Sequence, residues 1–326
     1  MTRSLYILIA LLIGCVLGCA GGALESPDTQ TDPTGLSATG PKADDFDDVD
    51  CPDTDALPDQ NPPGLSAMTR ITSMGIPTSR NQAIEYGCDL VAGTTGGIGL
   101  SALTAAMNLD INALVSPNAD GLIQSVILGH IDGWTPGQTG NGTGDVSFRL
   151  YSGVQKNGGD YGVDPVSFLS GGQPRVSWPA HVGCGRLETE PGPLVFEVPA
   201  ETSGVRASLS LMAARVSSQV VVNEQGLSIV EGTIVGYVPE SVIISIVQGI
   251  QENCQSANAS EICVQANSFL AGDAATITRN IVLPFLHGLD AHVDPDGRRV
   301  DSCSGDECNA LSICVRIEGE SASVVQ

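Results

Sequence analysis

Residues 205–222, VRASLSLMAARVSSQVVV, form a long alternating stretch, and this stretch limits the possible folds of the chain most strongly. Apolar and polar side chains alternate with a period of two, which places Leu209, Leu211 and Ala213, together with Val205 and Ala207, on one face of an extended strand. A second strand-like segment, GLSIVEGTIVGYVP, follows at residues 226–239. We therefore expect two long, consecutive β-strands.

Shorter strands and several helices are expected before and after these two long strands. Further strands are expected at residues 122–131, 145–153, 192–199 and 309–324. Helices are expected after Ser79 or Asn81, which are suitable N-caps, at residues 240–254 after Pro239, and once or twice within residues 261–289. The order of elements lacks the alternation of strand and helix that builds a parallel sheet. The predicted fold class is mainly β (α+β): an antiparallel sheet or β-sandwich with a few helices, disulfide-stapled.

A glycine pattern, VAGTTGGIGL, resembles the cofactor loop of short-chain dehydrogenases through Gly93, Gly97 and Gly99. That chemistry needs a buried strand before the loop and a helix whose N-terminus faces the pyrophosphate. The family also carries a catalytic Tyr and Lys at a fixed spacing, and here Tyr151 and Lys156 are one residue too far apart. The glycines are therefore expected to form a flexible turn or a close helix contact.

The N-terminus predicts export. Arg3 precedes an apolar run at residues 5–18, which is short for a membrane span. The following VLGCAGG resembles a bacterial lipoprotein signal, in which the cysteine is lipidated and becomes the first residue of the mature protein. Cys19 is the expected lipidation site and Cys15 the alternative, so residues 1–18 are expected to be the signal peptide.

The residues after Cys19 indicate where such a lipoprotein would be held. Ala20 and Gly21 follow it, whereas in lipoproteins of this kind an Asp there can signal retention in the inner membrane. The resemblance therefore implies the outer membrane or the cell surface. Several acyl chains attached at one cysteine would anchor the protein stably.

The number of cysteines supports cleavage before Cys19. This cleavage removes Cys15 and commits Cys19 to lipid, which leaves an even number of thiols. In an oxidising compartment these would form up to four disulfides, although eight cysteines allow 105 pairings. The remaining cysteines are Cys51, Cys88, Cys184, Cys254, Cys263, Cys303, Cys308 and Cys314.

Charge separates the N-terminal part of the mature chain from the rest. The protein has 14 Lys and Arg against 37 Asp and Glu, a net charge of −23, which excludes nucleic acid as a partner. Residues 19–64 are rich in Pro, Gly, Ser, Thr and Asp and are expected to form a disordered acidic tether. Residues 65–326 are expected to form a single β-rich globular domain.

The segment HVDPDGRRVDSCSGDEC is the strongest candidate for a cation site. Asp294 and Asp296, followed by Gly297, match three positions of a calcium loop, and Asp301 is offset by one residue from a regular repeat. His292 stands where the first Asp should be, however, and Cys303 occupies the position of the bidentate Glu. Calcium is the only cofactor suggested, and the alternative is an acidic turn held by cysteines.

Motifs for catalysis are largely missing. The sequence contains no G-x-S-x-G, S-x-x-K or H-E-x-x-H. His130 and Asp132 have the spacing of two ligands on one strand face, but a surface turn is the preferred interpretation. A serine hydrolase assembled from scattered residues is compatible with the sequence, because triads are defined by geometry.

Three segments from about Asn81 onward resemble a group of uncharacterised predicted lipoproteins typical of myxobacteria. They are residues 109–133, with a D-G before a strand; residues 208–243, with two strands and a helix; and residues 294–322, with an acidic turn before a terminal strand. Those relatives usually have a cleaner acidic turn and fewer cysteines there. The resemblance implies a lipoprotein but no activity.

Together these features predict a lipid-anchored cell-envelope protein with a non-enzymatic binding or structural role. It would contact the membrane through its N-terminal lipid. Two alternatives remain: a carrier of hydrophobic ligands, whose strands of small residues would line an apolar cavity, and an extracellular hydrolase. A solid core favours the structural role, a large dry cavity the carrier, and converging polar residues in a cleft the hydrolase.

Overall fold

The computed structural model describes residues 68–88, 98, 101, 110–133, 145–156, 159–183, 185–198, 207–223, 226–254, 272–286, 288–294, 299–300 and 303–325. The predicted signal peptide, the tether, the lipidation site and the glycine pattern lie outside these residues.

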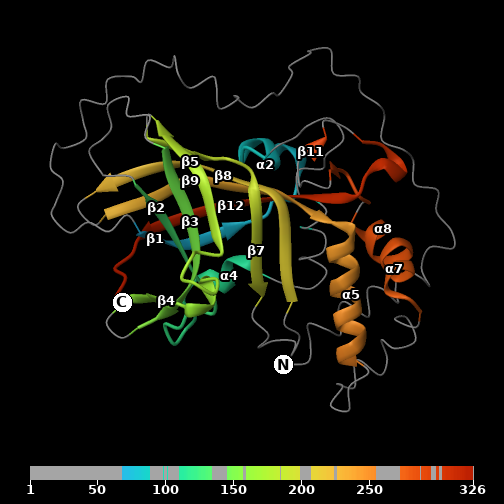
Figure 1. The fold of residues 1–326 in the computed structure, drawn as a ribbon, viewed down its shortest axis with the longest axis horizontal. Helices are drawn as coiled ribbons and strands as arrows, with labels where there is room; N and C mark the ends of the chain where they lie inside the picture. The colour runs from blue at the N-terminus through green and yellow to red at the C-terminus, as the bar shows by residue number, and fades with distance from the viewer. Residues whose placement is uncertain are drawn as a thin grey trace.

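Eight antiparallel strands form a closed β-barrel (Figure 1). They follow one another around the wall in the order β2-β1-β12-β9-β8-β6-β5-β3, and β3 pairs with β2 to close the ring. The strands are β1 (Met68–Gly75), β2 (Val126–Asp132), β3 (Asp145–Gln155), β5 (Val176–Gly183), β6 (Arg186–Thr189), β8 (Ala207–Asn223), β9 (Gly226–Pro239) and β12 (Ala310–Ser321).

Closure corrects one part of the predicted fold class. The mainly β, antiparallel character with a few helices is confirmed, but the sheet is a barrel and not a sandwich. Alternation along a strand reports only that one of its faces is buried. It carries no information on whether β2 pairs with both β1 and β3, which is the contact that closes the ring.

A β-bulge in β8 overturns a second expectation. The register with β9 shifts between Met212 and Arg215, and Ala213 has a φ of 47°. Leu211 and Ala214 belong to the main core, whereas Ala213 packs in a separate cluster with Tyr237. Leu211 and Ala213 therefore do not share a face as predicted, because the extra residue of the bulge reverses the alternation.

The barrel interior is filled by large apolar side chains. Phe148 and Trp178 lie stacked with ring centroids 6.3 Å apart, and each is at most 2% exposed. Leu187 and Ile229 from the other strands of the wall belong to the same buried cluster. An eight-stranded barrel is just wide enough for side chains to fill its interior, as they do here.

Helices lie against this core. The predicted helix at residues 240–254 is confirmed as α5 (Glu240–Cys254), and Ile243, Leu283 and Leu286 bury apolar side chains in the main cluster. The other helical segments are α2 (Arg80–Glu85), which is capped by Ser79, α4 (Ile111–Val115), α7 (Ala274–Ile277), the π-helix η5 (Thr278–Val282) and α8 (Leu283–Phe285). Within the described ranges, no helix is long and apolar enough to cross a membrane.

The remaining elements extend or cover the barrel. β7 (Gly192–Val198) pairs with the first half of β8, and β4 (Tyr161–Val163) pairs with β3. The short elements are η3 (Pro165–Ser167), β10 (His292–Val293), β11 (Arg299–Val300) and η6 (Gly305–Glu307). A second, smaller core forms around Leu128 and Tyr151.

Candidate functional site

Four of the predicted cysteines form two disulfides in the described part of the chain. Cys88 pairs with Cys314 and Cys303 with Cys308, with Cα atoms 5.7 and 5.2 Å apart, as is usual for disulfides. Disulfide cross-linking of the fold is thereby confirmed for these two pairs. Cys254 is the last residue of α5, whereas Cys51, Cys184 and Cys263 lie outside the described residues.

The Cys88–Cys314 disulfide joins the segment after α2 to the barrel wall. Both cysteines are buried, and Cys314 is only 1% exposed. Next to them the Thr233 hydroxyl of β9 donates to the backbone oxygen of Tyr86, and the guanidinium of Arg316 lies 5.7 Å from the Tyr86 ring. The disulfide therefore fixes α2 on the outer face of β9 and β12.

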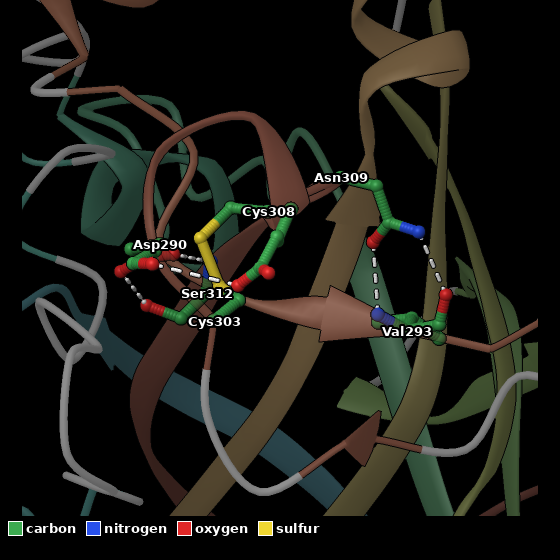
Figure 2. The surroundings of a disulfide bond; sticks show 8 residues. Asp290, Val293, Cys303, Cys308, Asn309 and Ser312 are labelled. Atoms are coloured by element: carbon green, nitrogen blue, oxygen red, sulfur yellow. Dashed lines mark hydrogen bonds between the residues drawn. A yellow bond between two sulfur atoms is a disulfide. The ribbon is translucent and has the colours of Figure 1, made fainter.

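Residues 294–308 lie between β10 and β12 in the sequence, and we call them the acidic excursion. The described residues on either side of this segment are joined by hydrogen bonds (Figure 2). The Asn309 side chain accepts from the backbone N–H of Val293 and donates to its carbonyl, both at 2.8 Å. The backbone N–H and the hydroxyl of Ser312 each donate to the buried Asp290 carboxylate at 2.6 Å. These contacts fix both ends of the excursion on β12.

Asp290 was not predicted from the sequence. The residue is 6% exposed, and a buried polar group of this kind is costly unless it is hydrogen-bonded. Its partner Ser312 lies on β12, and the two meet because Ala291 bridges to Ala310. No local sequence signal reports that alignment.

The excursion also faces the helices. The backbone N–H of Glu240 donates to the carbonyl of Asn309, and the Glu240 carboxylate pairs with Arg279 of the π-helix at 2.6 Å. Its hydrogen bond to Glu240 raises the pKa of Arg279, and the charges of Asp273 and Asp306 add to this effect. The negative charge of Asp306 in the excursion therefore favours the charged form of Arg279.

The calcium site stays a prediction, because two of its three carboxylates lie outside the described residues. Asp294 is half-buried directly after β10, and Asp296 and Asp301 lie outside the described residues. Among the described residues, no three His, Cys, Asp or Glu side chains are grouped so that they could hold a metal ion.

The structure places His130 and Asp132 within β2 and not in a turn. Asp132 pairs with Arg149 of β3 at 2.6 Å, so its carboxylate is already partnered by a cation. Burial lowers the pKa of His130; the Asp132 charge opposes this effect and the Arg149 charge adds to it. His130 is therefore neutral at pH 7, beside an ion pair on the outer face of the wall.

A second polar group on the wall contains a serine and a carboxylate, and no motif in the sequence indicates it. The Ser217 hydroxyl donates to Glu188 at 2.6 Å, and Arg186 contacts both Glu188 and Ser217. A serine nucleophile is usually activated by a histidine or lysine base, whereas Ser217 contacts a carboxylate and a guanidinium. The group therefore links β6 to β8 and lacks the arrangement of a hydrolase.

Comparison with known proteins identifies no relative: no protein-family model, curated protein or solved structure matches the chain significantly. The assignment of a function therefore depends on the geometry of the described residues.

Proposed function

We propose that the protein is a lipid-anchored, exported envelope protein in which a rigid barrel has a binding or structural role and no catalytic one. The predicted acidic tether would hold the barrel away from the membrane, and the acidic excursion would be presented on its surface.

The Cys88–Cys314 disulfide is the observation that carries this proposal. It joins residues 226 positions apart in the sequence and is buried against the barrel wall. Such disulfides persist in oxidising compartments and are rare where thiols are kept reduced. The disulfide therefore supports export, in agreement with the lipoprotein-like N-terminus.

The packing of the interior supports a structural or binding role over a carrier. Phe148 and Trp178 fill the centre of the barrel, where a carrier of hydrophobic ligands would need space. Among the described residues, the contacts of Ser217 with Glu188 and Arg186 do not favour the hydrolase alternative.

Acyl labelling tests the proposal. The full chain is expressed in a bacterial host with an outer membrane that is fed an alkyne-tagged fatty acid, and the protein is recovered by fractionation. We expect labelling in the outer-membrane fraction, abolished by Cys19→Ala and retained in the matched control Cys15→Ala. Labelling that survives Cys19→Ala, or an unlabelled protein in the cytoplasm, would refute it.

A further inference from the structure

The two disulfides differ in the properties that control thiol–disulfide exchange. Cys314 is 1% exposed and Cys88 is 8% exposed, so a reductant has little access to either sulfur. Cys308 is 8% exposed, as Cys88 is, but Cys303 is only half-buried, and the four residues between Cys303 and Cys308 are all exposed. Exchange requires a thiolate to reach a sulfur atom, and exposed disulfides are generally the labile ones.

Their spans in the sequence differ as well. Cys303 and Cys308 are five positions apart, whereas Cys88 and Cys314 are 226 apart. Cross-linking a short loop removes far less entropy from the unfolded chain than cross-linking a long one. The short disulfide is therefore of minor importance for the stability of the barrel.

Hydrogen bonds hold the base of the excursion without help from this disulfide. The Asn309 side chain binds Val293, and Ser312 binds Asp290. Within the loop, the contacts from Glu307 to Ser304 and from Cys308 to Gly305 are 3.2 Å long. Opening of the disulfide would therefore release the turn η6 and leave β12 in place.

We infer that Cys303–Cys308 is a redox-sensitive clasp, opened by a dithiol reductant under conditions in which Cys88–Cys314 stays closed. A thiolate of the reductant attacks Sγ of Cys303, the more exposed of the two cysteines, and Cys308 leaves as a thiolate and takes up a proton. The second thiolate of the reductant then attacks the reductant's other sulfur atom, which is bonded to Sγ of Cys303 in the mixed disulfide. The reductant becomes a disulfide, Cys303 is released as a thiol, and two electrons have passed to the protein.

Opening would change the surface beside the helices. Asp306 lies in the η6 turn and acts on Arg279 in the closed form. A released turn would let the exposed carboxylates of Asp306 and Glu307 move. The redox state of the clasp would thus decide whether these two charges are held in place next to β12.

Graded reduction of the oxidised full chain tests the inference. The protein is treated with dithiothreitol, a neutral dithiol that the carboxylates of Asp306 and Glu307 do not repel. Free thiols are alkylated at intervals and located by peptide mass spectrometry. We expect Cys303 and Cys308 to be alkylated at least about tenfold faster than Cys88 and Cys314, which serve as the internal control. Equal rates, or earlier opening of Cys88–Cys314, would overturn the inference.

Two further measurements address the order of attack and the effect on the fold. A neutral monothiol, 2-mercaptoethanol, should give a mixed disulfide on Cys303, and an adduct mainly on Cys308 would contradict the proposed route. The double variant Cys303→Ser/Cys308→Ser should keep the circular-dichroism spectrum of the oxidised protein, and its melting temperature should fall by less than that of Cys88→Ser/Cys314→Ser. Loss of the folded state in this variant would show that the disulfide is structural and not a clasp.

Discussion

Side chains are closely packed at single positions of the described core, and Gly192 is the clearest case. A Cβ atom there would overlap Cδ1 and Nε1 of the Trp178 indole. The indole is 2% exposed and donates to the carbonyl of Pro193 at 3.2 Å, so it has no room to move aside.

Gly192→Ala should therefore destabilise the protein by about 1–3 kcal/mol, the usual cost of overpacking a core. Gly249 is the matched control, because it lies in α5 and a Cβ there would meet nothing within 4 Å. Gly249→Ala should be neutral or stabilise by up to about 1 kcal/mol through helix propensity. Urea unfolding measures both variants. Equal effects would contradict the packing described for Trp178.

His130 makes stability depend on pH. Its pKa in the folded protein is below 6.5, mainly because the ring is buried, so the unfolded chain binds more protons just below pH 6.5. Stability should therefore rise with pH through this window and fall when the pH is lowered.

His130→Gln removes this group while keeping a polar side chain. The natural protein should lose more stability than the variant between about pH 8 and pH 5, because only the natural protein has this histidine to protonate. The free energy of unfolding in urea at the two pH values measures the difference. An equal or larger loss in the variant would show that His130 is not the group responsible.

At the scale of elements, strands and helices with an uninterrupted pattern were predictable. β9 and α5 begin and end where their periodicity begins and ends. β5 was missed because Pro179 interrupts it, and proline in a run argues against a strand. β6 has only four residues, too few for a pattern. The bulge at Ala213 was not predictable, because the left-handed conformation there depends on the pairing with β9.

The two disulfides should differ in what they contribute to stability. In the chain-entropy model, Cys88→Ala/Cys314→Ala should cost about 5 kcal/mol and Cys303→Ala/Cys308→Ala about 2 kcal/mol, because the loops they close differ so much in length. Thermal and urea unfolding of the two double variants provide the comparison. A larger loss for the short pair would contradict the assignment of Cys88–Cys314 as the structural cross-link.

At the scale of the whole molecule, closure of the sheet was the part that sequence reasoning could not reach. β2 pairs with both β3 and β1. These pairings depend on how all the strands are arranged around the barrel, and not on the sequence of β2 alone. The candidate site was only partly predictable for the same reason. The cysteines and the acidic turn were visible, but the pairing of Cys88 with Cys314 and the anchoring of Asp290 by Ser312 depend on the folded barrel.

Native mass spectrometry of the mature protein, extracted from the membrane in mild detergent, tests the central claim of a packed, disulfide-linked and lipid-anchored barrel most directly. We predict a chain that begins at a lipid-modified Cys19, lacks eight hydrogens relative to the fully reduced form, and carries no co-purifying apolar ligand. A chain that begins elsewhere, retains free thiols, or holds a stoichiometric lipid inside the barrel would contradict the account.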